Sequence, residues 1–201
     1  IDMRSFYASV EAVRLGLDPM TTLLAVVGDI TRPGSIILAT SPALKKKHGL
    51  KNVSRFFELP KDPNIHIVPA NMADYLHVSV QIVKLLNEFA PQEAIHPYSI
   101  DEIWITVDGL ERLFGPYEII AQKIQHKILN RFGITSAIGI GDNKFLAKVT
   151  LDIHAKKAEN GIAECRYEDV KDMLWPIPIN EIWGIGKRLT NHLHRLGITN
   201  L

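Results

Sequence analysis

The sequence contains only one cysteine, Cys165, among its 201 residues. A single cysteine cannot form an intramolecular disulfide or a thiolate zinc cage, so we expect a reducing compartment, the cytoplasm. No apolar run approaches the roughly 20 residues needed to span a membrane. We find no signal peptide, low-complexity segment or internal repeat. The eight histidines include no HExxH or other zinc spacing, so we assign them no special role. These absences argue against a disulfide-rich secreted domain, a membrane protein and a zinc enzyme.

The chain also lacks an excess of charge of either sign, since its net charge is +1. Its length suits one full core plus a smaller appended unit. The basic residues nevertheless gather along the sequence. A single basic cluster is usually a solvated surface, but several clusters in a chain with an acidic site predict contacts to phosphate. The three clusters are Lys45, Lys46, Lys47, Lys51 and Arg55; Lys144, Lys148, Lys156 and Lys157; and Lys187, Arg188 and Arg195.

Three acidic residues lie where predicted strands meet turns: Asp2, and the adjacent pair Asp101 and Glu102. Carboxylates from two strands can hold two magnesium ions, and such a pair of ions suits an in-line displacement at phosphorus. Adjacent residues of a regular strand point to opposite faces. Asp101 and Glu102 can therefore face one site only if the strand begins, kinks or bulges there, and Pro97 and Ser99 favour a turn at that point.

The hydrophobic pattern predicts an α+β fold with a split βαβ (ferredoxin-like) plan, in which helices cover one face of an antiparallel sheet. A strand pair and a short helix precede this plan, and Gly184 and Gly186 precede a last helix with Leu189, Leu193 and Leu196. The expected strands are a stub at 1–3, 23–27, 36–39, 65–68, 103–107 and 136–140, and the expected helices are 42–47, 73–90, 116–132 and one around 146–153.

Four motifs in order resemble those of Y-family translesion DNA polymerases of the UmuC and DinB group, especially UmuC-like UV-damage repair proteins. Residues 2–11 (Asp-Met-Arg-Ser-Phe-Tyr-Ala-Ser-Val-Glu) and 99–102 (Ser-Ile-Asp-Glu) resemble the two metal-binding motifs. Residues 141–148 resemble the next motif, and residues 182–188 resemble the helix-hairpin-helix of the thumb. The resemblance covers essentially the whole chain.

The resemblance implies a role for each matching residue near the acidic site. Asp2, Asp101 and Glu102 would be the catalytic metal ligands, with help from the Met3 carbonyl, for two Mg²⁺ ions. Whether Mg²⁺ or Mn²⁺ is the working metal stays open. Tyr7 would be the steric gate, a ring beneath the nucleotide sugar that excludes a 2′-hydroxyl by clash. Phe6, its neighbour in the nucleotide site, is expected to pack.

The residues expected to bind phosphate depart in part from the family pattern. Lys46 occupies the basic position of the fingers, but Ala43 stands where DinB-like members have a tyrosine. The triphosphate-binding lysine usually follows Asp152 by three residues, where this chain has Ala155. Lys156 is the first candidate and Lys157 the second.

For the DNA, the resemblance implies a helix-hairpin-helix contact. Gly184 and Gly186 would present backbone N–H groups to a DNA phosphate, beside Lys187 and Arg188.

The domains implied are a catalytic palm (1–10 and 67–165), small α/β fingers (11–66) and a partial helical thumb (166–201). The implied function is low-fidelity, DNA-templated DNA synthesis across damage, in DNA repair and the UV-damage or SOS response. The implied partners are primed template DNA, a deoxynucleoside triphosphate (dNTP) and a sliding clamp, reached through a C-terminal domain. Both ends of the chain look cut, and we expect this domain to be missing. We expect a monomer and no membrane partner.

Two alternatives stay open. A palm-type nucleotidyl cyclase could use similar carboxylates without Tyr7, the glycine turn or a template. A non-catalytic DNA-binding relative would not need all three carboxylates.

Overall fold

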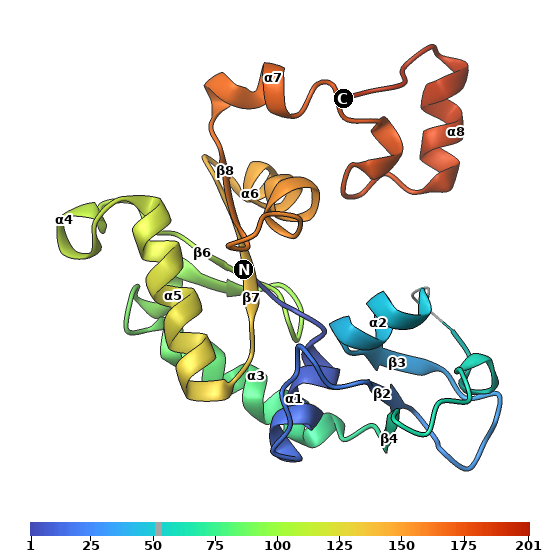
Figure 1. The fold of residues 1–201 in the computed structure, drawn as a ribbon. Helices are drawn as coiled ribbons and strands as arrows, with labels where there is room; N and C mark the ends of the chain where they lie inside the picture. Colours follow the sequence, from blue (N-terminus) through green and yellow to red (C-terminus); the bar gives the residue numbers. More distant parts are fainter. Residues whose placement is uncertain (51–53) are drawn as a thin grey trace. The chain divides into compact units, whose positions relative to one another are not determined.

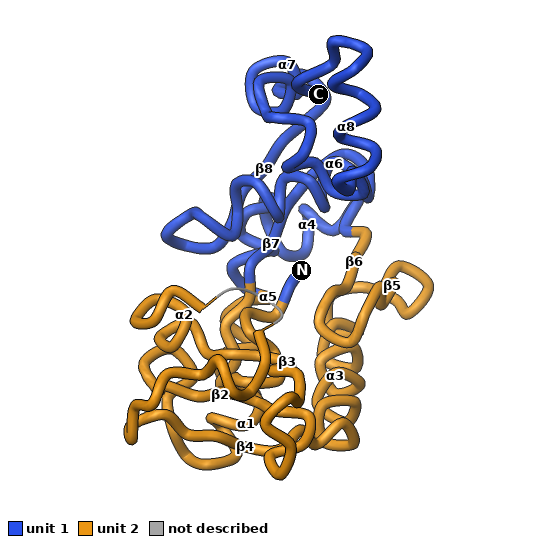
Figure 2. The backbone as a smooth tube through the Cα atoms, turned by 90° about the vertical axis from the view of Figure 1, so that its right-hand side faces the viewer, with its two compact units in different colours: residues 1–2, 107–123, 137–201 blue, residues 3–106, 124–136 orange. Residues whose placement is uncertain are grey.

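The computed structural model describes residues 1–50 and 54–201, which form helices and three small sheets (Figure 1). The predicted α+β class is confirmed. Lys51 lies outside the described residues. The chain forms two compact units (Figure 2). Unit 1 comprises residues 1–2, 107–123 and 137–201, and unit 2 comprises residues 3–106 and 124–136.

The strands are β1 (Asp2–Met3), β2 (Leu24–Val27), β3 (Ile37–Thr40), β4 (His66–Pro69), β5 (Ile95–Pro97), β6 (Ile103–Ile105), β7 (Ser136–Gly141) and β8 (Ile162–Cys165). The α-helices are α1 (Phe6–Arg14), α2 (Pro42–His48), α3 (Met72–Leu86), α4 (Glu111–Phe114), α5 (Tyr117–Phe132), α6 (Lys144–Thr150), α7 (Val170–Met173) and α8 (Lys187–Arg195). Short 3₁₀ turns are η1 (Phe56–Glu58), η2 (Gln92–Ala94), η4 (Tyr167–Asp169) and η5 (Ile179–Glu181), and η3 (Leu151–Ala155) is a π-helix.

Unit 2 contains the sheet β3-β2-β4, in which β2 is antiparallel to β3 and parallel to β4. All four residues of β2 are fully buried, because α1 and α2 cover the sheet (Figure 1). The predicted strand pair and the helix predicted at 42–47 are confirmed, and Gly49 ends α2 in the left-handed region at φ 61°. The strand predicted at 65–68 is β4, and it completes this sheet by pairing with β2.

Two helices of unit 2 differ from the sequence expectation. Helix α1 was not predicted, because its nine residues offer too short an apolar pattern to separate a helix from a strand. Helix α3 ends at Leu86, four residues before the predicted end at Ala90. Residues 87–90 continue as tight turns, in which the N–H of Phe89 donates to the carbonyl of Leu86.

Another sheet has the order β1-β7-β8, with β7 parallel to β8. Strand β8 was not predicted. Helix α6 lies directly on β7, because a Cβ at Gly139 would be 2.2 Å from the carbonyl oxygen of Ala147. A Cβ at Gly141 would be 2.6 Å from the amide nitrogen of Ala147. Glycine is therefore required at both positions of β7 for this packing.

One apolar cluster of unit 1 joins Leu146 and Val149 of α6 to Leu174, Ile179 and Ile182 near the end of the chain. Ile185 and Leu193 pack against this cluster. It holds α8 and the turn before it.

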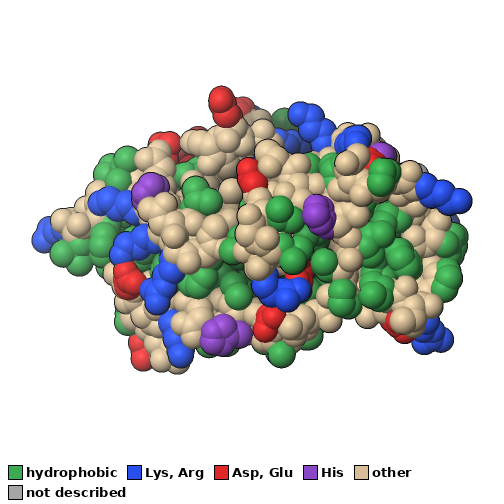
Figure 3. Space-filling model, turned by 60° about the horizontal axis from the view of Figure 1, so that its bottom comes forward, with side chains coloured by type: hydrophobic (Ala, Val, Ile, Leu, Met, Phe, Trp, Pro, Cys, Tyr) green, Lys and Arg blue, Asp and Glu red, His purple; other side chains and the backbone are tan. Residues whose placement is uncertain are grey.

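On the face drawn in Figure 3, basic and acidic side chains are interspersed with apolar ones. Within the described residues, no helix combines the length and hydropathy required to cross a membrane.

Candidate active site

Asp101 and Glu102 lie in the turn of the β5–β6 hairpin, before β6 begins at Ile103. Ser99 organises this turn: its hydroxyl donates to Oδ1 of Asp101 at 2.7 Å and accepts the Glu102 N–H at 3.1 Å. The N–H of Tyr98 donates to the carbonyl of Glu102 at 2.9 Å. The predicted turn at Ser99 is confirmed. Since neither acid is in a regular strand, the rule that neighbouring side chains alternate does not apply to them.

The chain segment that follows Asp2 is tied to this turn within unit 2. The N–H of Met3 donates to the carbonyl of Asp101 at 3.0 Å, and the N–H of Arg4 donates to the carbonyl of Thr135 at 2.9 Å. Ser5 then adopts a left-handed conformation at φ 48°, the only non-glycine residue described with positive φ. A serine in this region is strained. The strained residue turns the chain from β1 into α1 within two residues.

Tyr7 lies on the first turn of α1, one residue after Phe6. Phe6 is 2% exposed, as expected for a packing residue, whereas Tyr7 is partly exposed. The ring of Tyr7 stacks on Tyr75 from α3, with 4.5 Å between centroids and 15° between planes. Burial, and then the negative charge of Asp101, raise the pKa of the Tyr7 hydroxyl. Tyr7 therefore lies within electrostatic reach of an acidic candidate.

In unit 1, the Asp2 carboxylate is bound by a lysine. The Nζ atom of Lys156 lies 2.9 Å from Oδ2 of Asp2 and 2.8 Å from Oδ1 of Asp152. The buried Lys148 contacts Asp152 from one helical turn earlier, at 3.1 Å. Burial lowers the pKa of Lys156, but the charge of Asp2 and the hydrogen bonds with Asp152 and Asp2 outweigh it, so the net direction is upward.

Lys156 follows Asp152 by four residues, one more than the three of the family pattern. Asp152 lies within the π-helix η3, and Lys156 follows its last residue, Ala155. Residues four apart are neighbours on a helix surface, and the Nζ atom of Lys156 lies 2.8 Å from Oδ1 of Asp152.

The donor set fits a hard divalent cation, because Mg²⁺ and Mn²⁺ prefer carboxylate and carbonyl oxygens. Asp2, Asp101 and Glu102 are each partly exposed, which leaves them accessible. Across residues 1–50 and 54–201, no three His, Cys, Asp or Glu side chains form a ready-made metal cluster.

The fingers candidate Lys46 is exposed on α2. Its neighbour Lys47 pairs with Asp62 at 2.7 Å, and the ring of His48 lies 3.2 Å from the same carboxylate. The adjacent Lys47 is therefore already engaged, while the Lys46 side chain faces solvent.

The candidate DNA contact lies at the start of α8. Gly184 has φ +87°, which glycine adopts without strain, and Gly186 is the N-cap of α8. Lys187 and Arg188 form the first turn and are exposed. The backbone N–H groups at the start of α8 and the side chains of Lys187 and Arg188 thus lie together, as an anion site requires.

Two polar networks were missed by sequence reasoning. In unit 2, the hydroxyl of Tyr75, within the helix predicted at 73–90, donates to Glu11, within the motif 2–11, at 2.8 Å.

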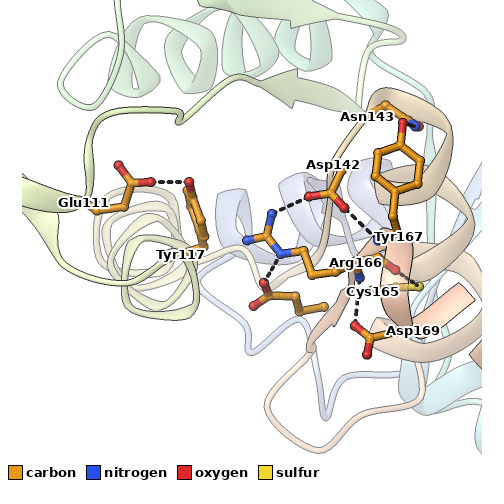
Figure 4. A network of polar contacts seen from close by, with 9 residues as sticks. Glu111, Tyr117, Asp142, Asn143, Cys165, Arg166, Tyr167 and Asp169 are labelled. Carbon is orange, nitrogen blue, oxygen red and sulfur yellow. Dashed lines mark hydrogen bonds and ion pairs between the residues drawn. The ribbon is translucent and has the colours of Figure 1, made fainter.

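In unit 1, Arg166 pairs with Asp142 at 2.7 Å and lies 4.5 Å from the ring centre of Tyr117 (Figure 4). Asp142 also accepts the Tyr167 N–H, and Asn143 donates to the Tyr167 hydroxyl. No spacing rule links residues so far apart in the sequence.

Comparison with known proteins gives two family matches. Residues 1–152 match the impB/mucB/samB family, and residues 167–198 match the helix-hairpin-helix (HHH) motif of the same family.

Among curated relatives, the chain is 48% identical over its full length to the Bacillus subtilis protein named "Putative UV-damage repair protein UvrX", covering 47% of that protein. It is 38% identical to "DNA polymerase IV 2" of the same organism, covering 48%. The chain thus spans about half the length of the curated relatives it matches.

Among solved structures, 99% of the chain superposes on a "Y-family DNA polymerase chimera Dbh-Dpo4(243-245)-Dbh" with a TM-score of 0.82 and 30% identity, covering 57% of that chain. An "Insertion ternary complex of Dbh DNA polymerase" gives a TM-score of 0.80, also at 30% identity and 57% coverage. The expected fold class, with a palm, fingers and a helix-hairpin-helix thumb, is confirmed by this likeness, and the residue bounds given for these domains stay predictions.

The order of the acidic motifs, the fold around them and these matches agree, and the chain belongs to the impB/mucB/samB family, the UmuC/DinB group of Y-family DNA polymerases.

Proposed function

We propose that the chain is the catalytic portion of a DNA-templated DNA polymerase that transfers a nucleotidyl group from a dNTP to a primer 3′-hydroxyl. The observation that carries this proposal is the 3.0 Å hydrogen bond from the Met3 N–H to the Asp101 carbonyl. It ties the residue that follows Asp2 to the turn of Asp101 and Glu102. Asp2, Asp101, Glu102 and the Met3 carbonyl would then hold two Mg²⁺ ions, or Mn²⁺.

When bound, these ions would lower the pKa of the primer hydroxyl and neutralise charge on the reacting phosphate. The protein's own groups supply the positioning. Lys156 is a cation beside Asp2 and would contact the triphosphate of the incoming nucleotide. Lys46 would give a second contact, as a point charge without the bidentate fork of an arginine.

Tyr7 would set the choice of sugar. Its ring is stacked on Tyr75 and its hydroxyl is within electrostatic reach of Asp101, as a gate beneath the nucleotide sugar requires. A rigid ring discriminates against a 2′-hydroxyl by clash.

The thumb segment would hold the duplex without selecting its sequence. Gly184, Gly186, Lys187 and Arg188 offer N–H groups and positive charge to a phosphate, and phosphate contacts position a protein on DNA rather than specify a base. The proposal also includes low-fidelity synthesis, bypass of damage in the UV response and a monomeric state. It further includes a contact with a sliding clamp, made through further sequence.

Primer extension on a primed template with Mg²⁺ tests it. We would compare the chain with Asp101→Asn and with Glu93→Gln, which changes an exposed acid in η2 of the same unit. We expect template-directed addition by the chain and by Glu93→Gln, and none by Asp101→Asn. DNA binding without addition would favour the non-catalytic relative, and a cyclic product formed without template would favour the cyclase.

A further inference from the structure

The carboxylate of Glu11, on α1, is completely buried and lies outside the set of acids that nucleotidyl transfer uses. Both of its oxygens are engaged. Oε1 accepts from the hydroxyl of Tyr75 at 2.8 Å. Oε2 accepts from Nη2 and Nε of Arg14 at 2.7 and 2.9 Å.

Burying a carboxylate is costly unless it is paired and hydrogen-bonded. Arg14 supplies the countercharge from one turn along α1, and its own side chain is half exposed at 52%. With Oε2 occupied by Arg14, Oε1 is the oxygen left for Tyr75. The arginine thereby orients Glu11 toward α3.

Tyr75 is also completely buried, and its hydroxyl is fixed by Glu11. Burial raises the pKa of Tyr75, as does the hydrogen bond with Glu11, so the hydroxyl stays protonated and donates. The ring of Tyr75 is also fixed by its stack with Tyr7, with 4.5 Å between the ring centroids and 15° between the ring planes. Phe6 flanks Tyr7 in a tilted contact at 6.0 Å.

We propose that Glu11 and Tyr75 are positioning residues that fix the ring plane of Tyr7 and so set the discrimination between deoxyribonucleoside and ribonucleoside triphosphates. This inference rests on the proposed function, in which Tyr7 is the gate. A gate that works by clash must resist displacement, because a ring that can tilt admits the 2′-hydroxyl. The Glu11–Tyr75 hydrogen bond supplies that resistance, because it fixes the ring on which Tyr7 stacks.

The test uses Tyr75→Phe, which keeps the stacked ring and removes the hydroxyl, and Glu11→Gln as a second variant. The matched control is Tyr117→Phe in unit 1, which also removes a tyrosine–glutamate hydrogen bond, the one to Glu111 (Figure 4). The readout is the ratio of kcat/KM for a dNTP to that for its ribonucleotide. We expect Tyr75→Phe to lower this ratio about threefold to tenfold, the range of one hydrogen bond, and Tyr117→Phe to leave it unchanged.

A double-mutant cycle separates positioning from a general structural effect. If Tyr75 acts through Tyr7, then Tyr75→Phe has no further effect on the ratio once Tyr7 is alanine. An equal effect in both backgrounds would overturn the inference.

A second readout needs no catalysis. The ¹⁹F NMR signal of 3-fluorotyrosine placed at position 7 should shift or broaden in Tyr75→Phe and in Glu11→Gln, but not in Tyr117→Phe. An unchanged signal in both unit 2 variants would overturn the inference whether or not the chain extends primers. Absence of extension by the unaltered chain would count against the proposed function instead.

Discussion

The ammonium of Lys156 lies 2.9 Å from Oδ2 of Asp2 and also contacts Asp152. A candidate metal ligand is thus neutralised by a lysine of the same unit. The same cation can serve the negative charge of a triphosphate, because Asp152 holds it in place independently of Asp2.

Replacing Lys156 with alanine should raise the KM for the incoming dNTP by about tenfold, the factor that corresponds to one charge-assisted hydrogen bond. Steady-state primer extension measures this. Lys157→Ala is the control, since Lys157 is exposed next to it. If Lys157→Ala raised the KM and Lys156→Ala did not, the assignment of the triphosphate contact would be wrong.

Removal of the Tyr7 ring should raise ribonucleotide incorporation by about tenfold or more, since the proposed discrimination is steric. Single-nucleotide insertion with dNTP and ribonucleotide in parallel measures the effect for Tyr7→Ala. Tyr7→Phe keeps the ring and should keep the selectivity. Equal selectivity in Tyr7→Ala and the unaltered chain would remove Tyr7 from the gate role.

Gly139→Ala should destabilise the protein by about 1–3 kcal/mol, as overpacking does. The new Cβ would be 2.2 Å from the Ala147 carbonyl oxygen, and a backbone atom cannot move away cheaply. Urea unfolding measures the loss. Gly34→Ala is the control, because its Cβ would meet nothing within 4 Å, and it should leave the midpoint nearly unchanged. Similar midpoints for both variants would show that α6 can move off β7.

Loss of the positive charges at the start of α8 should weaken DNA binding to the same extent on every sequence. Each of Lys187→Ala and Arg188→Ala should reduce the slope of log K against log salt concentration by about 1, as expected for one phosphate contact. Fluorescence anisotropy at several salt concentrations measures this, with Lys171→Ala on α7 as the control. An unchanged slope in both variants would place the duplex elsewhere.

Acid should weaken the network around Arg166. The Arg166 guanidinium and the Tyr167 N–H lower the pKa of Asp142 below its usual 3.8. A depressed folded-state pKa gives stability that is present above the unfolded-state value and is lost as pH falls through the folded-state value. Asp142→Asn should therefore flatten the fall in melting temperature below about pH 4, the range of an ordinary aspartate. Asp172→Asn on α7 should not; equal curves for the two variants would contradict the role of Asp142.

The sequence allowed prediction of the features that depend on local pattern. The turn at Ser99, the strand pair expected at 23–27 and 36–39, the helix that begins at Pro42 and the helix expected from Pro116, which begins at Tyr117, follow from turn residues and hydrophobic spacing. The motif order also indicated the family.

Features that depend on pairing across long sequence distances could not be predicted. The bond between Tyr75 and Glu11 joins residues 64 positions apart, and nothing in an apolar helix pattern marks one tyrosine as hydrogen-bonded. Strand β8 is short, and it is defined by its pairing with β7 in the folded chain rather than by a local sequence pattern. The ion pair of Arg166 with Asp142 likewise forms only when the fold brings the two residues together.

The π-helix at Leu151–Ala155 also bears on how such chains should be compared. A widened turn lets a helix gain a residue without displacing the side chains on either side of it. An alignment that demands a fixed interval between the aspartate and the lysine would score Ala155 as a lost function, whereas under the proposed role of Lys156 the cation lies one place further along the chain, in contact with Asp2 and Asp152. Deleting Ala155 should convert the segment into an ordinary α-helix and leave the Lys156 ammonium on Asp2.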